Sequence, residues 1–230
     1  MEQQTMEKLP GVDFAHSYGM TESMIVTTNP PENHSTAARA QGLHLSAGCA
    51  GIGIEVMIVD PEGNEVPRGT VGEILVRSAG VTPGYWNRPE DTAKALQDGW
   101  LHTGDGAYMN DQGYIFIVDR LKDMIVSGGE NVYSAEVENV LGRHAAVAMS
   151  AVIGVPHEKW GEAVHAVVVL KPGMQATEAE IQEHCRAHIA GYKCPKTVEF
   201  RQAMPLSGAG KILKRDLRAP HWDGKTRAVN

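Results

Sequence analysis

A block of charge between two apolar runs constrains this chain more than any other feature. Residues 119–123, Asp-Arg-Leu-Lys-Asp, carry four charges in five positions. They follow the strand-like segment 114–118 and precede a second apolar run, 124–126. Such a stretch suits a solvated crossing between two globular bodies better than a core element. The sequence therefore predicts two domains, residues 1–121 and 122–230, that meet at this crossing.

Composition excludes several classes of protein. At 230 residues the chain is long enough to bury a core in two modest domains. Its formal net charge of −7 gives no basic field for nucleic acid, and no apolar run is long enough to span a membrane. Three cysteines without metal-like pairing, and a polar start without a signal-peptide pattern, favour a cytoplasmic protein. The composition leaves a homo-oligomer open.

The two domains are expected to differ in architecture, with an α+β fold overall. Before the crossing, strands at 54–60 and 72–77 with Pro/Gly turns indicate a small, β-rich, antiparallel or barrel-like subdomain. After it, a compact α+β domain is expected in the order β-α-β-β-α-β, with two helices on one face of a sheet. Its elements are strands 124–126, 147–155, 163–170 and 197–201 and helices 135–141 and 177–189.

Side chains near two of these helices predict how the helices begin. Ser134 is expected to be the N-cap of the first helix, and Thr177 and Glu180 to form a capping box for the second. His184 and His188, one turn apart on the second helix, have a metal-like spacing. No third ligand is apparent in the sequence, so an exposed or half-buried helix face is the preferred interpretation.

Three further segments carry groups suited to nucleotide chemistry. In His16–Ser23, Tyr18 offers a ring face, Gly19 permits close backbone approach, and Thr21 and Glu22 offer a phosphate donor and a Mg²⁺ ligand. A loop before a helix is the alternative.

The second segment, Gly99–Asp105, ends in a carboxylate that can accept hydrogen bonds from a ribose diol. The alternative is a turn aspartate bonded to its own backbone. In the third segment, Gly208 and Gly210 precede Lys211, so a loop could carry that amine into a cleft. There the alternative is a solvated helix face shared with other cations, Lys214, Arg215 and Arg218.

Together with the charged crossing, these segments resemble the adenylate-forming superfamily of acyl-CoA synthetases, peptide-synthetase adenylation domains and luciferase-like enzymes. The resemblance extends from residue 16 to residue 215, and is strongest to fatty-acyl or aryl acid–CoA ligases. It implies that a carboxylic acid reacts with ATP and Mg²⁺ to give an acyl-adenylate, and then with CoA to give a thioester and AMP. In that reading residues 1–121 are the end of a large AMP-binding domain and residues 122–230 are a mobile lid.

The resemblance also implies individual roles for matching residues. Lys211, Thr21 and Glu22 would be catalytic, Glu22 as the metal ligand, and Lys122 would be the hinge. The nucleotide would be bound by Tyr18, Gly19, Thr21, Asp105, Ile117, Arg120 and Lys211. CoA would be bound by Gly128, Gly129, Trp160, Tyr192 and Lys196, for which a core tryptophan and a helix-stop turn are the alternatives.

The sequence departs from the family at its front. The family's phosphate loop and most of its acyl pocket would precede His16, where only 15 residues stand. The chain is therefore expected to be the C-terminal part of such a ligase, inactive alone, with the missing N-terminal half as its partner. The alternatives are a carrier-protein-loading adenylation domain and a non-catalytic fragment that binds nucleotide or CoA.

Overall fold

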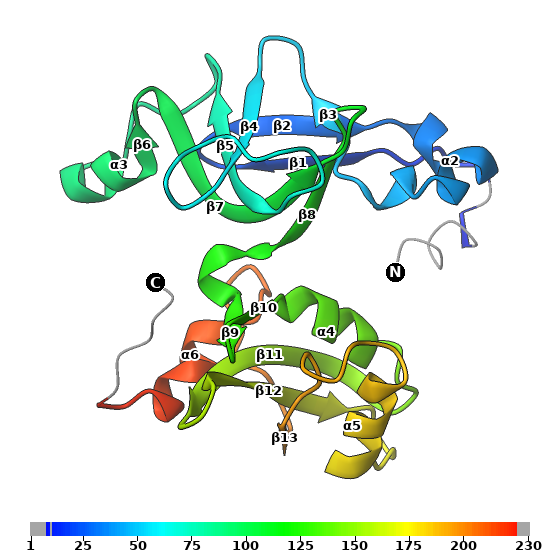
Figure 1. The fold of residues 1–230 in the computed structure, drawn as a ribbon. Coiled ribbons are helices and arrows are strands. Elements are labelled where there is room, and N and C mark those ends of the chain that lie inside the picture. Colours follow the sequence, from blue (N-terminus) through cyan, green and yellow to red (C-terminus); the bar gives the residue numbers. More distant parts are fainter. Residues whose placement is uncertain (1–7, 10, 225–230) are drawn as a thin grey trace. The chain divides into compact units, whose positions relative to one another are not determined.

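A computed structural model of the chain describes residues 8–9 and 11–224 (Figure 1). The first residues, on which the expected absence of a signal peptide rested, lie outside this part. The described chain divides into two compact units between Val118 and Asp119, and each is described by itself. None of the helices in the described ranges is long and apolar enough to cross a membrane. The assignment of the units as domain remnant and lid stays a prediction.

Unit 1 consists mainly of antiparallel strands in two sheets. One sheet has the order β1-β2-β3, and the other has the order β4-β5-β7-β6 with β8 paired to β7. The strands are β1 (His16–Met20), β2 (Met24–Asn29), β3 (Cys49–Ala50), β4 (Glu55–Val59), β5 (Gly72–Arg77), β6 (Leu96–Gln97), β7 (Trp100–Met109) and β8 (Ile115–Arg120), the last of which runs on into unit 2. The helical segments are η1 (Pro31–His34), α2 (Thr36–Ala40), η2 (Leu43–Leu45) and α3 (Pro89–Ala95). The predicted strands near 54–60 and 72–77 are confirmed as β4 and β5.

The core of unit 1 fixes the hairpin β1–β2 against the second sheet. Val26 of β2 is fully buried with Ile74 of β5 and Leu101 of β7. Tyr18 and Met20, from alternate positions of β1, pack partly buried against the same cluster. The hairpin is thus held by apolar contacts, and the ring of Tyr18 is held with it.

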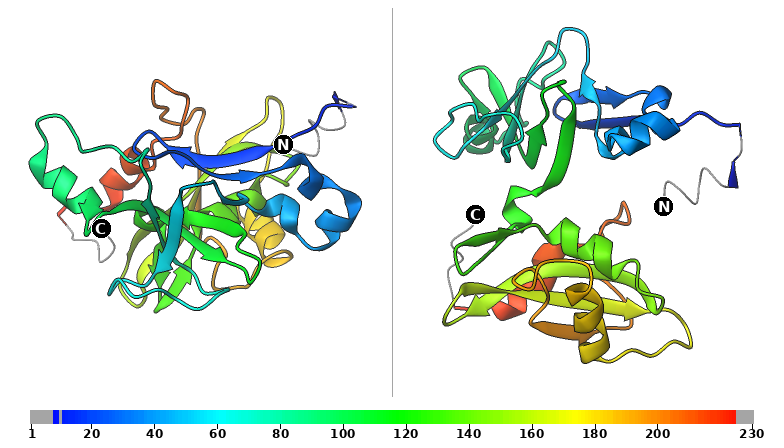
Figure 2. Two further views of the ribbon diagram at one scale, coloured as in Figure 1. Left: turned by 90° about the horizontal axis from the view of Figure 1, so that it is seen from above. Right: turned by 45° about the vertical axis from the view of Figure 1, so that its right-hand side comes forward.

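Unit 2 is the expected α+β body. Its sheet has the order β10-β9-β12-β11, and β13 runs parallel to β12. Figure 2 shows the ribbon of this unit from two further sides. The strands are β9 (Ile125–Ser127), β10 (Glu130–Val132), β11 (Val147–His157), β12 (Gly161–Leu170) and β13 (Thr197–Phe200). The helical segments are η3 (Leu121–Asp123), α4 (Ser134–Leu141), α5 (Glu178–Arg186), α6 (Lys214–Arg218) and η4 (Ala219–His221). The predicted strands and both predicted helices of this unit are confirmed, with ends that shift by up to three residues.

Each face of this sheet has its own apolar cluster because strand side chains alternate. On one face, Val164 and Val168 of β12 pack with residues of α4 and α5, among them Leu141 and Ile181. On the opposite face, residues of β11 and β12 pack with Leu217 of α6, which is 0% exposed. The two helices expected on one face are therefore present. Helix α6, which was not predicted from the sequence, covers the other face.

One of the two predicted helix caps is wrong. Thr177 and Glu180 form the expected capping box at the start of α5. At α4 the N-cap is Tyr133, without a side-chain hydrogen bond, and Ser134 is the first helical residue. The Ser134 hydroxyl instead donates to Asp119 Oδ2 at 2.6 Å, and the Ala135 amide donates to the same oxygen at 3.2 Å. A carboxylate from the charged crossing thus replaces the predicted cap, and it complements the helix dipole.

The buried Cys185 of α5 gives a prediction for thiol reactivity. Burial, with a smaller contribution from the neighbouring Cys194, raises the pKa of Cys185 to about 11. Because the thiolate is the nucleophile, a pKa two units above the ordinary 9.0 leaves about 100-fold less of it at pH 8. Iodoacetamide should therefore label Cys185 at least about 100-fold faster in guanidinium than in the native protein, as measured by mass spectrometry of its peptide. Equal labelling rates in the two states would contradict this packing.

Candidate functional site

The turn after β1 carries the first predicted nucleotide residues. Gly19 lies in a register shift of the β1–β2 hairpin, where a Cβ would come within 2.0 Å of the Met24 carbonyl oxygen. The close backbone approach predicted for Gly19 is therefore made by the neighbouring strand of the same hairpin. Thr21 is exposed and Glu22 half-buried in the turn that follows. The hairpin thus explains Gly19 structurally, and its contact with a nucleotide stays a prediction.

A break in strand pairing positions Asp105. The register between β5 and β7 shifts between Glu73 and Leu75, so that extra residues of β7 lie between their paired positions. The Glu73 carboxylate stabilises this segment by accepting from the Gly104 amide at 2.9 Å, and it lies 2.8 Å from His102 Nδ1. Irregular pairing of this kind can redirect a side chain from its regular position in the strand.

Tyr18 and Asp105 meet although they are 87 positions apart in the sequence. The Tyr18 hydroxyl donates to Asp105 Oδ2 at 2.8 Å. Asp105 is 7% exposed, and its backbone amide donates to the Thr103 hydroxyl at 3.1 Å. The Asp105 carboxylate is thus oriented by Tyr18, and its binding to a ribose stays a prediction. A ring face and an oriented carboxylate lie together in unit 1.

Glu22 has a partner that the sequence analysis did not identify. The Tyr85 hydroxyl donates to Glu22 Oε1 at 2.8 Å, and the Thr82 amide donates to the Glu22 carbonyl oxygen at 2.7 Å. The hydrogen bond to this carboxylate, with burial, raises the pKa of Tyr85, so its phenol remains a donor. No local signal could have paired these residues, since 63 positions separate them. Ile117, on β8 of the same unit, is 40% exposed, and its contact with a base stays a prediction.

Unit 2 contains a hollow of about 550 Å³ beside the crossing. Six of its ten lining residues are cationic, among them the predicted Arg120, Lys122 and Lys211. A concave surface with this charge suits an anion such as a phosphate or carboxylate. The structure therefore gathers Arg120, Lys122 and Lys211 on one hollow of unit 2.

Lys211 ends a tight turn that hydrogen bonds define. The Ser207 amide donates to the Lys211 carbonyl oxygen at 2.8 Å, and the Lys211 amide donates to the Ser207 hydroxyl at 3.1 Å. Gly210 takes a φ of +76°, which favours glycine at that position. The turn presents an exposed Lys211 side chain at the hollow.

The cations after Lys211 do not form a uniformly solvated face. Lys214 Nζ lies 2.8 Å from Glu138 Oε1 of α4, and both side chains are less than a quarter exposed. Arg218 pairs with Asp123 at 2.8 Å, and each side chain is 13% exposed. Arg218 also donates to the Lys122 carbonyl oxygen at 2.8 Å, so the predicted hinge residue is held to α6. Arg215 alone of these three matches the solvated interpretation, at 88% exposure of its side chain.

Four of the five predicted CoA residues lie together. The Gly128 amide donates to the Trp160 carbonyl oxygen at 2.9 Å, and Lys196 Nζ lies 5.3 Å from the centroid of the Trp160 ring. Gly128 and Gly129 have φ of +63° and +87° in the two-residue turn between β9 and β10, a conformation that itself calls for glycine. Tyr192 is 44% exposed, and its ring lies beside Lys193 instead.

Comparison with known protein families finds a match in each of the two units. The AMP-binding enzyme family matches residues 1–86, and the AMP-binding enzyme C-terminal domain matches residues 136–211. The chain is 42% identical over 219 residues to the fatty acid–[acyl-carrier-protein] ligase ScoC of Streptomyces coeruleorubidus, covering 95% of this chain and 42% of that one. It is 46% identical over 208 residues to the feruloyl-CoA synthase of an Amycolatopsis species, covering 90% of this chain and 41% of that one.

Solved structures give a similar result. The o-succinylbenzoate CoA synthetase of Bacillus subtilis, in complex with an acyl-adenylate, aligns with a TM-score of 0.84 at 34% identity, over 94% of this chain and 42% of that one. The amide bond synthetase of Marinactinospora thermotolerans aligns with a TM-score of 0.78 at 38% identity, over 89% and 41%. The chain spans about two fifths of the length of the curated relatives cited here.

Proposed function

Since the chain belongs to the adenylate-forming superfamily of AMP-binding enzymes, we propose that it supplies the C-terminal part of an acid–CoA ligase. In the proposed reaction a carboxylate oxygen attacks the α-phosphorus of ATP and pyrophosphate leaves. The sulfur of CoA then attacks the acyl carbonyl carbon, a thioester forms, and AMP leaves. The single observation that carries the proposal is the hydrogen bond between Tyr18 and Asp105, which joins two predicted nucleotide residues in one structure.

The nucleotide is proposed to bind unit 1 through groups that the hairpin and β7 already orient. The Tyr18 ring offers a face to adenine, and Asp105, whose Oδ2 is bound by Tyr18, would accept hydrogen bonds from the ribose hydroxyls. Ile117 would contact the base, and Gly19 and Thr21 would approach the α-phosphate. A carboxylate already held in place loses less side-chain entropy when it binds a ligand.

Glu22 fits the role of a Mg²⁺ ligand, because Mg²⁺ prefers carboxylate oxygens and Tyr85 already orients this one through Oε1. Bound there, Mg²⁺ would neutralise phosphate charge during the attack.

Lys211 is proposed to stabilise the charge that develops on the phosphorus and the leaving pyrophosphate. Its exposed ammonium group lies on a hollow rich in cations, shared with Arg120 and the hinge residue Lys122. Placing fixed positive charge where negative charge develops is usually the largest single contribution to catalysis of this kind.

For the second half-reaction, the turn at Gly128 and Gly129 with Trp160 and Lys196 is proposed to bind CoA, and Tyr192 is proposed as a further contact. Lys196 offers a cation to CoA phosphates, and glycines without side chains let a pantetheine arm approach the backbone. An acyl-carrier protein is the second candidate acceptor, because a relative 42% identical is named as a ligase for that acceptor.

Binding of AMP to the 230-residue chain tests the nucleotide half of the proposal. We expect AMP to raise the melting temperature, since a ligand of the native state stabilises it. Tyr18→Phe removes the hydrogen bond to Asp105, and we expect AMP affinity measured by calorimetry to fall about 10-fold. Tyr114→Phe is the matched control, because Tyr114 in the same unit bonds Asn33 instead. No stabilisation by millimolar AMP, or equal losses in both variants, would contradict the assignment.

A further inference from the structure

Three side chains of unit 2 that the proposed reaction does not use lie close together. They are His165 of β12, Glu199 of β13 and His221 of η4, and their ligand atoms all lie within 4.8 Å of one another. His165 is on the α6 face of the sheet, because Val167, two residues further along β12, packs in the cluster that contains Leu217. The residues come from three separate elements, so the fold and not local sequence brings them together.

The two ring nitrogens of His165 differ: one is hydrogen bonded, and the other is left to bind a metal ion. It is 6% exposed, and its Nδ1 lies 2.7 Å from the hydroxyl of Thr197, its cross-strand neighbour in the parallel pair β12–β13. Its other nitrogen, Nε2, is buried and has no hydrogen-bond partner among the described residues. That nitrogen faces Glu199 Oε2 at 3.6 Å, beyond hydrogen-bonding distance. A buried imidazole nitrogen without a partner is costly unless something binds it.

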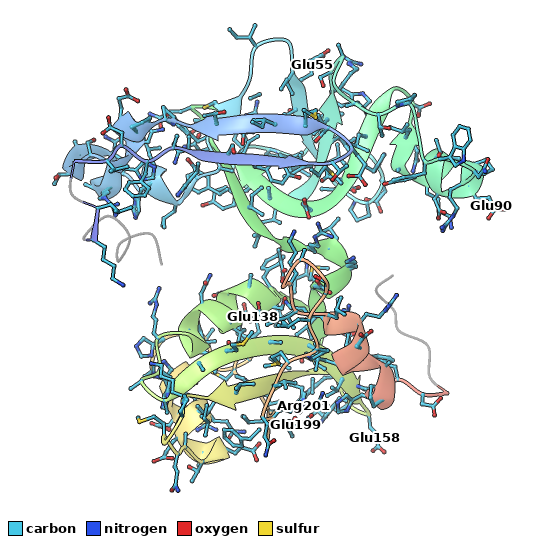
Figure 3. The ribbon with its side chains drawn as sticks, turned by 180° about the vertical axis from the view of Figure 1, so that it is seen from behind. Glu55, Glu90, Glu138, Glu158, Glu199 and Arg201 are labelled. Atoms are coloured by element: carbon cyan, nitrogen blue, oxygen red, sulfur yellow. The ribbon has the colours of Figure 1, made fainter. Side chains whose placement is uncertain are left out.

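Glu199 is oriented by a neighbour that is not itself a ligand. Arg201 Nε binds Glu199 Oε1, and the labelled Glu199 and Arg201 lie side by side in Figure 3. The other oxygen, Oε2, is the one directed at His165. This is the arrangement of many metal sites, where an outer hydrogen bond fixes each ligand: Thr197 does so for His165 and Arg201 for Glu199.

We propose that His165, Glu199 and His221 bind one Zn²⁺ ion. Two imidazoles and one carboxylate are a ligand set that zinc favours, with the fourth position left to water. Ligands of a tetrahedral zinc ion lie about 3.3 Å apart, close to the separation of His165 Nε2 and Glu199 Oε2. Because all three ligand atoms already lie within 4.8 Å, side-chain rotation of His221 would complete the set.

A bound ion would connect η4, the last helical segment that the structure describes, to the sheet. His221 ends η4, which directly follows α6, whereas His165 and Glu199 belong to paired strands. Zinc would thus hold α6 at both ends, since Lys214 at its start already pairs with Glu138. Binding should therefore stabilise unit 2 as well as saturate at one ion per chain.

The test is a zinc titration of the full chain without nucleotide, against a chromophoric chelator. We expect one tight site and a rise in melting temperature. Loss of an outer hydrogen bond typically costs about 10–100-fold in metal affinity, so Thr197→Val should weaken zinc by about 10-fold and the ligand variant His221→Ala by more than 100-fold. The loss of zinc affinity in Glu199→Gln should lie between the losses in these two variants. Cobalt in place of zinc should give visible absorption bands that His221→Ala removes.

His188→Ala is the matched control, because His184 and His188 on α5 have a metal-like spacing and ring centroids 4.6 Å apart. In the structure these two bond backbone carbonyl oxygens, of Val140 and His184 respectively. We expect zinc affinity within twofold of the parent chain in this variant. The proposal is overturned if His221→Ala binds zinc as the parent does, or if His188→Ala loses the site. His221 and Glu199 are only half-buried, so circular dichroism should show both variants folded, which excludes unfolding as the cause.

Discussion

Replacing Lys211 by alanine is expected to lower acyl-adenylate formation by about 10²–10³-fold, the usual loss when one donor to developing charge is removed. The assay should use this chain in place of the matching segment of the Amycolatopsis feruloyl-CoA synthase, since the chain spans only 41% of that enzyme. Pyrophosphate release with ATP, Mg²⁺ and acid measures the first half-reaction. Thioester formation from supplied acyl-adenylate measures the second, and we expect it to change by less than about twofold.

The contrast between the half-reactions is what makes this result specific. A general defect in folding or in nucleotide binding would lower both rates together, and an equal loss would rule out the role assigned to Lys211. Arg215→Ala is the matched control, because Arg215 also lines the hollow but its side chain is 88% exposed and pairs only with its neighbour Asp216. We expect that variant to keep both activities.

Replacing Lys214 by alanine is expected to destabilise unit 2 by about 3 kcal/mol, because it leaves the carboxylate of Glu138 largely buried without its cation. Ser134 also loses a partner, since Lys214 Nζ lies 2.6 Å from its hydroxyl. For a unit of this size the melting temperature should fall on the order of 10–15 °C, as measured by calorimetry. Figure 3 shows Glu138 on unit 2.

A double variant separates the charge from the packing. Lys214→Met combined with Glu138→Leu removes both charges, and we expect it to recover most of the stability, since burying an ion pair costs desolvation that apolar residues avoid. Burial already raises the pKa of Glu138 against the opposing effect of Lys214. Protonation of Glu138 removes the unpaired buried charge in the Lys214→Ala variant. The stability that this variant loses relative to the parent chain should therefore shrink as the pH falls toward the pKa of Glu138. This account would be contradicted if the stability lost in Lys214→Ala did not depend on pH and the double variant regained none of it.

Much of the fold could be predicted because its signals are local. Short apolar runs between Pro/Gly turns indicated β4 and β5, a longer apolar run indicated β12, and Thr177 with Glu180 identified the start of α5. The hairpin of β1 and β2 was missed. Its strand His16–Met20 carries a glycine at a register shift and shows no clear alternation of apolar residues.

The parts of the candidate site that were missed depend on contacts between distant residues. Tyr85 binds Glu22 across 63 positions, and Asp119 caps α4 in place of the predicted Ser134. Nothing next to Glu22 in the sequence signals its partner, and a serine before a helical segment gives the same pattern whether or not it is the cap. His165, Glu199 and His221 went unnoticed for the same reason, because their spacing in the sequence does not resemble a metal motif.

Helix α6 has a consequence for how fast unit 2 folds. Its five residues cover one face of the sheet, and its Arg218 binds Asp123 across 95 positions, almost the full length of the unit. Contacts between residues so far apart in sequence require the closure of a long loop, which slows folding. During synthesis, the sheet would emerge from the ribosome with this face bare until residues 214–218 follow. Refolding kinetics of unit 2 should therefore end in a slow phase in which Leu217 becomes buried.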